Sequence, residues 1–327
     1  QHSGSGARPQ VDGARMLTRE DAVMQALAAL VEQTEPTGSG TGAREDIREL
    51  AAAVQAVSQA YTRERHAIDQ NATGEAAYRA RRRFYLPRDG AKVVKPLVEL
   101  HQAGALPTAP RWRVLDLGAG LGSTSLGAAA TLARLPDTSV RELVVDAVER
   151  DAGALRHFTR IAAGAEAAGL PRVTVRPLAV DLRKHVVEGP YDLILAGLVL
   201  NELLAEAPEQ AAARLASLVA QLAPGGSLIV LEPALREPTR ALHQTRDALR
   251  AHPGVALFGP CVHHAACPML AGPKDWCHED VDATLPDALG QVAREAGLRF
   301  ERMTYAYLTL RRAGDGAANV ADLLSIR

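Results

Sequence analysis

Short runs of hydrophobic residues recur along the middle of the chain, and each run is followed by a stretch compatible with a helix. Continuous apolar runs of this length suit strands that are buried on both faces. Strands that alternate with helices are typical of an α/β fold with a mainly parallel sheet, whose ligands bind at the carboxyl ends of the strands. The runs are Val114 to Leu117, Leu143 to Val148, Val173 to Leu178, Leu193 to Leu198 and Ser227 to Leu231.

The N-terminal part of the chain has a different periodicity. Ile47, Leu50, Val54 and Val57 recur at steps of three and four, which is the spacing of one helix face. We therefore expect a largely disordered tail and linker with one short helix over residues 1–42 and a helical region over 43–108. A ligand-binding domain over 109–252, a cysteine-rich loop over 253–285 and a C-terminal helix and strand over 286–327 complete the expected organisation.

Charge and composition exclude several classes of protein. The chain has 37 Lys and Arg against 38 Asp and Glu, which disfavours a globally basic nucleic-acid binder. Its longest apolar run, Leu193 to Leu200, is far shorter than the roughly 20 residues of a membrane span. Three cysteines in a chain of 327 residues do not form a disulfide framework, and this favours a reducing compartment. We expect a cytoplasmic monomer without a membrane partner.

A glycine-rich loop follows the first predicted strand. The chain reads D-L-G-A-G-L-G from Asp116 to Gly122, and a helix is expected from Ser125 to Leu135. Alternating glycines let the backbone turn tightly and approach a ligand, and the helix offers free N–H groups. Flavin and nicotinamide sites use similar loops, but the dinucleotide pattern requires a glycine where this chain has Ser123.

Acidic residues stand where the next two strands are expected to end. Glu149 closes the second strand, and a carboxylate there can accept both hydroxyls of a ribose. Asp181 follows the third strand, where an acid can accept from the exocyclic amine of adenine. An adenosine with a positive end and no phosphate fits such an acidic pocket, so we predict S-adenosylmethionine. The predicted cofactor-binding residues are Asp116, Gly118, Gly120, Gly122, Glu149 and Asp181.

The order of these parts resembles the class I S-adenosylmethionine-dependent methyltransferases, with their Rossmann-like fold, over about residues 109–235. The fourth predicted strand ends at Asn201 and Glu202, and a Pro-Gly-Gly turn leads into the fifth. The chain lacks the Asn/Asp-Pro-Pro-aromatic motif of amino-group methyltransferases, which disfavours an exocyclic base amine as acceptor. Asn201 and Glu202 are the candidate catalytic residues, with packing or capping as their alternative role.

All three cysteines lie close together near the C-terminal end of the chain. Cys261, Cys267 and Cys277 lie in a loop rich in proline and glycine, where three thiolates are able to wrap a soft metal. Their spacing, C-x5-C-x9-C, differs from the paired C-x2-C of a zinc ribbon. The segment reads P-C-x-H, then C-P, then D-W-C-H.

With V-L-N-E-L, L-E-P and T-Y-A-Y-L-T-L-R-R elsewhere in the chain, this segment resembles a methyltransferase-like family. That family is associated with the mitochondrial small ribosomal subunit and has bacterial relatives; the resemblance spans about residues 45–312. It implies S-adenosylmethionine binding, a [4Fe–4S] cluster on four cysteines and a role in small-subunit assembly. Cys261, Cys267 and Cys277 take three ligand positions, and no fourth cysteine follows. The alternatives are a histidine as fourth ligand (His263, His264 or His278) and zinc as the metal.

A second candidate site is a basic and aromatic stretch in the N-terminal helical region, which suits contact with an RNA backbone but also an ordinary charged helix surface. The favoured function is a methyltransferase acting on rRNA or another ribosomal component. The alternatives are a catalytically silent RNA-binding assembly factor, and a methyltransferase for a protein or small molecule with a structural metal. The basic residues are Arg79, Arg81, Arg82, Arg83 and Arg88.

Overall fold

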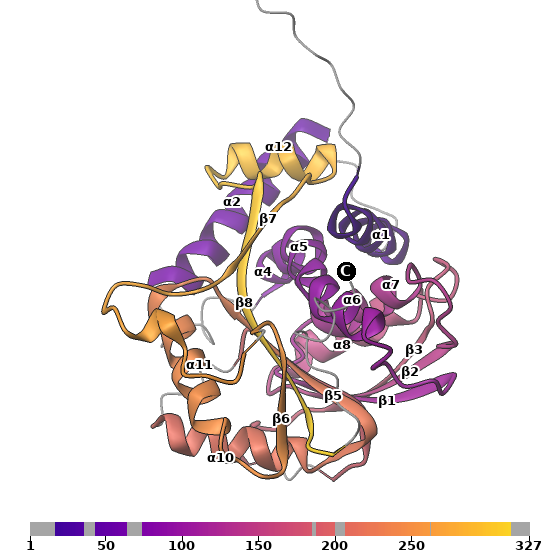
Figure 1. Ribbon diagram of the computed structural model, residues 1–327. Coiled ribbons are helices and arrows are strands. Elements are labelled where there is room, and N and C mark those ends of the chain that lie inside the picture. Colours follow the sequence, from indigo (N-terminus) through magenta and orange to yellow (C-terminus); the bar gives the residue numbers. More distant parts are fainter. Residues whose placement is uncertain are drawn as a thin grey trace, which may run out of the picture.

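The computed structural model describes residues 17–35, 43–63, 74–184, 188–199, 207–261 and 263–314. Its centre is an eight-stranded sheet (Figure 1). The strands are β1 (Arg111–Leu117), β2 (Glu142–Val148), β3 (Arg172–Leu178), β4 (Tyr191–Gly197), β5 (Leu222–Pro233), β6 (Val255–Gly259), β7 (Glu279–Asp282) and β8 (Arg302–Arg312).

The strand order is β3-β2-β1-β4-β5-β8-β6, with β7 paired to the start of β8. Strands β1 to β5 pair in parallel, whereas β8 is antiparallel to its three partners, β5, β6 and β7. Parallel neighbours require crossover connections, and three helices with their loops supply them: α7 (Ser123–Leu132), α8 (Ala152–Ala162) and α10 (Pro208–Val219). This order, with its antiparallel strand next to last, confirms the Rossmann-like class I methyltransferase fold predicted from the sequence.

Helices cover both faces of the sheet (Figure 1). On one face α7 (Ser123–Leu132) packs against β1 and β4, and α1 (Arg19–Thr34) and α8 (Ala152–Ala162) join the same core. On the other face α10 (Pro208–Val219) and α11 (Arg236–Leu249) pack against β5 and form a second core. Away from the sheet, α12 (Asp287–Glu295) packs against α2 (Ala43–Arg63). No helix of the described ranges combines the length and apolarity needed to cross a membrane.

One uninterrupted helical path runs from residue 75 to residue 102, shortly before β1. It consists of α4 (Glu75–Ala80), a π-helical turn η1 (Arg81–Tyr85), α5 (Leu86–Gly90), a 3₁₀ turn η2 (Ala91–Val93) and α6 (Val94–Gln102). Pro87 has no N–H for the carbonyl of Arg83, which interrupts the α-helical ladder where the wider π turn forms.

This helical path packs directly on the helix that follows the glycine loop. A Cβ on Gly127 of α7 would lie 2.0 Å from the carbonyl oxygen of Gly90 in α5. Only two glycines allow backbones to approach so closely. The contact places α4 and η1 beside the glycine loop.

Two short elements have no counterpart in the hydrophobic pattern. Strand β7 reads E-D-V-D, and it exists because it pairs with the start of β8. Strand β6 joins the sheet through β8 as well. The predicted Pro-Gly-Gly turn lies inside the first half of β5, where the register with β4 shifts.

Candidate functional site

The glycine loop between β1 and α7 has left-handed backbone at three positions. The φ angles are 67°, 52° and 83° at Gly118, Gly120 and Gly122, a region that favours glycine. A Cβ on Gly122 would lie 2.1 Å from the ring of Phe158, so this glycine is required for packing. At Gly120 the nearest atom is instead the end of a flexible side chain, Nη2 of Arg81 at 3.2 Å. The loop therefore presents Gly120 towards the N-terminal helical path.

The carboxylate of Glu149 joins the glycine loop to the start of α8. Its Oε2 accepts from the N–H of Gly120 at 3.0 Å, and its Oε1 accepts from the N–H of Asp151 at 2.9 Å. The parallel register of β1 and β2 brings the ends of the two strands together. Each oxygen keeps a lone pair for a further donor. The structure thus brings together two residues that the sequence assigned to one cofactor site.

Asp116 lies beneath the loop and is 1% exposed. The pKa of its carboxyl is raised to about 7: burial is the largest cause and the nearby Glu149 adds to it, whereas hydrogen bonds from Ser125 act in the opposite direction. The Ser125 hydroxyl donates to Asp116 at 2.6 Å and ties α7 to the end of β1. Asp116 therefore supports the loop from within the core.

Asp181 lies in the turn after β3 and is bonded to its own neighbour. It accepts from the backbone N–H and the guanidinium of Arg183, at 2.9 and 2.7 Å, and these bonds lower the pKa of the carboxyl. A ligand at this position has to share the carboxylate with Arg183. The two candidate catalytic residues, Asn201 and Glu202, lie outside the described residues.

The three cysteines lie within electrostatic reach of one another. Burial raises the pKa of the Cys261 and Cys277 thiols, and the neighbouring Cys267 raises both further. Even so, within the described ranges no three His, Cys, Asp or Glu side chains come close enough to hold a metal ion. As placed, these residues do not fit either predicted metal group, the [4Fe–4S] cluster or zinc.

Side chains of α11 hold the cysteine loop by hydrogen bonds to its backbone. Arg246, which is 2% exposed, donates to the carbonyls of His263 and Ala265 at 2.5 and 2.6 Å. Arg240 donates to two further loop carbonyls at 2.7 Å, and the Nε2 of His243 lies 3.2 Å from the carbonyl of Cys277.

The sequence reasoning missed these α11 residues. Their spacing of three residues, from Arg240 to His243 to Arg246, places them on one face of a helix and was the available signal. Of the predicted alternative ligands, His264 is exposed and His278 stacks on Trp276 with 6.1 Å between ring centroids.

The predicted RNA-contact arginines are engaged within the protein. Arg79 and Arg83 both form ion pairs with Asp46. Arg82 is 4% exposed and forms an ion pair with Glu75 at 3.1 Å. The remaining two are placed differently: Arg81 is directed to the glycine loop, and Arg88 lies 3.4 Å from the carbonyl of Arg299. These contacts form a network that joins helices rather than an open basic surface, and an RNA contact here stays a prediction.

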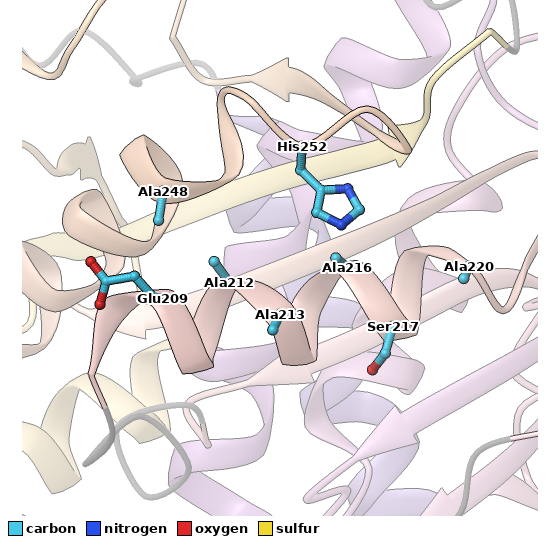
Figure 2. Close-up of a pocket in the computed structure, with 8 residues that line it drawn as sticks. All are labelled: Glu209, Ala212, Ala213, Ala216, Ser217, Ala220, Ala248 and His252. Atoms are coloured by element: carbon cyan, nitrogen blue, oxygen red, sulfur yellow. The ribbon is translucent and has the colours of Figure 1, made fainter.

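A shallow groove lies elsewhere, along α10 on the opposite face of the sheet. Figure 2 shows its lining, which consists largely of alanines such as Ala212 and Ala216 together with His252. It has a volume of about 490 Å³ and includes none of the predicted site residues.

Comparison with known proteins assigns the family. Residues 86–321 match the family described as mitochondrial small ribosomal subunit Rsm22. The chain belongs to this family. The description of the Rsm22 family contradicts the cytoplasmic location expected from the sequence, and that expectation was wrong. Scarce cysteines favour a reducing compartment in general, and neither they nor the balanced charge distinguishes the cytoplasm from the mitochondrial interior.

No curated protein matches the chain. Among solved structures it is similar to Trm5b from Pyrococcus abyssi, with 13% identity and a TM-score of 0.34 over 68% of this chain and 49% of that one. It is also similar to a methyltransferase from Pyrococcus furiosus, with 13% identity and a TM-score of 0.37 over 68% and 82% of the two chains. A tRNA m1G37 methyltransferase of M. jannaschii gives 10% identity and a TM-score of 0.35 over 69% and 49%. The chain thus spans about half the length of the first and third of these proteins.

Proposed function

We propose that this Rsm22-family chain binds S-adenosylmethionine where β1 and β2 end, and transfers its methyl group to rRNA or another component of the small ribosomal subunit. The observation that carries the proposal is the position of Glu149, whose Oε2 accepts a hydrogen bond from the N–H of Gly120 at 3.0 Å. A ribose held there would lie against the glycine loop, where the backbone allows close approach.

Each predicted residue has a distinct part in holding the cofactor. The free lone pairs of Glu149 accept the two ribose hydroxyls, and Asp181 accepts from the adenine amine while it keeps its bond to Arg183. Asp116 and Ser125 hold the loop in its shape. The bound cofactor supplies a methyl group on a sulfonium, so the protein's main task is to position the acceptor in line and exclude water. Asn201 and Glu202 are the residues we propose to orient that acceptor.

The ribosomal part of the proposal is supported by the family, whose description names the mitochondrial small ribosomal subunit. The arginines of the N-terminal helices do not add to this support, because acidic partners or backbone carbonyls occupy most of them. For the cysteine loop we propose a soft metal, an iron–sulfur cluster or else zinc. The support is the chemistry of three neighbouring thiols; the loop would have to close around the metal, since the described residues form no group of three ligands as placed.

Cofactor binding is tested by calorimetric titration of the full chain with S-adenosylmethionine. We expect Glu149→Ala to weaken binding by about tenfold or more, because two charge-assisted hydrogen bonds are lost. Glu142→Ala is the matched control: it lies at the opposite end of the same strand and pairs with the exposed Arg111. Absence of binding by the wild type, or equal loss in both variants, contradicts the proposal.

Methyl transfer is tested separately with radiolabelled cofactor and purified small subunits. Label in the RNA or ribosomal protein fraction supports the enzyme. Cofactor binding without any transferred label indicates the silent assembly factor instead. Label in a soluble protein or small molecule, but not in the subunit, indicates a methyltransferase for a protein or small molecule.

A further inference from the structure

Arg81 reaches into the proposed cofactor site from outside the glycine loop. Its Nη2 lies 3.2 Å from the position of a Cβ on Gly120, and its side chain is 16% exposed. The carboxylates around it are those of Glu149, which bonds Gly120, and Asp151, which caps α8. Arg81 therefore brings a cation beside Gly120, at the part of the site formed by the carboxylates of Glu149 and Asp151, whereas Arg183 lies at Asp181.

The helix that carries Arg81 explains this direction. Arg81 begins the π-helical turn, and its carbonyl accepts from the N–H of Leu86 five residues later. Such turns change the rotation of the residues around them and occur frequently at functional sites. The neighbouring Arg79, Arg82 and Arg83 are directed to acids of the N-terminal region. Arg81 alone of this group faces the glycine loop.

The ion pair between Arg81 and Asp151 leaves N–H donors of the guanidinium available. Among the described residues its shortest ion pair, to Oδ2 of Asp151, measures 3.6 Å and is longer than a hydrogen bond. That carboxylate already accepts from the hydroxyl of Tyr78 and from the N–H groups of Gly153 and Ala154. A guanidinium carries five N–H donors in a planar fork that matches a carboxylate, so donors remain for a ligand.

We propose that Arg81 binds the carboxylate of the amino-acid end of S-adenosylmethionine, which makes it the residue that selects a cofactor with that group. This inference rests on the proposed function. The acids of the site attract the sulfonium and the amine of the ligand but repel its carboxylate. One cation beside Gly120 removes this repulsion and holds the amino-acid end along the loop.

The test compares S-adenosylmethionine with decarboxylated S-adenosylmethionine, which differ only in this carboxylate. Both are titrated calorimetrically into the full-length wild type, Arg81→Gln, Arg81→Lys and the control Arg79→Gln. Arg79 lies two residues away and pairs with Asp46 and Glu49 instead of facing the loop. Thermal unfolding of each variant verifies that it is folded.

We expect Arg81→Gln to weaken the binding of S-adenosylmethionine by about tenfold or more and to leave the affinity for the decarboxylated ligand unchanged. Arg81→Lys should recover part of the loss, and Arg79→Gln should bind both ligands as the wild type does. Equal weakening of both ligands by Arg81→Gln would show a structural role and overturn the inference, as would no weakening at all. If the wild type binds neither ligand, the proposed function fails and the inference fails with it. If the wild type binds but Arg81→Gln does not discriminate, only the inference fails.

Discussion

The hydroxyl of Tyr78 donates to the carboxylate of Asp151, 73 residues later in the chain, at 2.8 and 2.9 Å from its two oxygens. Asp151 caps α8 by accepting from the N–H groups of Gly153 and Ala154. Burial and this carboxylate raise the pKa of Tyr78 to about 12, so the hydroxyl stays a donor at neutral pH. The bond fastens the helix that carries Arg81 to the element beside the proposed cofactor site.

Removal of this bond should destabilise the protein. We expect Tyr78→Phe to lower the free energy of unfolding by about 1 kcal/mol, because a charge-assisted bond is lost while Asp151 keeps its backbone donors. Urea unfolding of Tyr78→Phe, Asp151→Asn and the double variant gives their coupling energy, since asparagine still caps the helix. Additive effects of the two substitutions would contradict a direct interaction.

The buried carboxyl of Asp116 should make stability depend on pH. Burial favours its protonated form, so between the unfolded pKa of about 3.9 and the folded pKa of about 7 the folded state holds a proton that the unfolded state has lost. The free energy of unfolding should therefore decrease as the pH rises through this range, by an amount on the order of 4 kcal/mol.

Asp116→Asn isolates this effect, because the amide oxygen still accepts from Ser125 and carries no charge to bury. The measurement is urea unfolding of wild type and variant at the two ends of the pH range. Other titrating groups are common to both proteins and cancel in the difference. A difference that does not change with pH would show that Asp116 does not titrate in this range.

The clamp by Arg246 should control the cysteine loop. Arg246→Met keeps the apolar stem but leaves the carbonyls of His263 and Ala265 without this donor. We expect faster proteolytic cleavage between Cys261 and Cys277 and a loss of about 1–3 kcal/mol in unfolding free energy. Arg250→Met is the control, since Arg250 is exposed and bonds only one loop carbonyl among the described contacts. Equal cleavage rates in the two variants would exclude a specific clamp.

If the cysteine loop binds a metal, Cys267→Ser should lower the metal content without changing affinity for S-adenosylmethionine. The loop and Glu149 belong to different elements, and a thiolate ligand is lost without disturbing the glycine loop. Iron, acid-labile sulfide and zinc are measured in protein prepared without oxygen, and cofactor affinity is measured by calorimetry. Wild-type protein free of all three would contradict the metal proposal. Zinc without iron would show that the metal is zinc and not an iron–sulfur cluster.

Much of the fold and half of the proposed cofactor site could be predicted from local patterns. Apolar runs identified β1 to β5, and the residues that follow a strand in a parallel sheet must lie at one edge, which brought Glu149 to Gly120. The acidic strand β7 could not be predicted, because it forms only where β8 offers a partner. Arg79 and Arg83 could not be placed either, since their partner Asp46 lies in another helix.

The sequence by itself determined the strands β1 to β5, the glycine loop and the cysteine cluster, because strand periodicity, glycine conformation and thiol chemistry are local properties. Only the tertiary structure decided which partner each charged side chain contacts. It directed Arg81 to the glycine loop and its neighbours to acids, and it tied the cysteine loop by its carbonyls to α11. The position of Arg81 beside the glycine loop depends on the close approach of Gly90 to Gly127 and on a π turn, which bring together residues far apart in the chain.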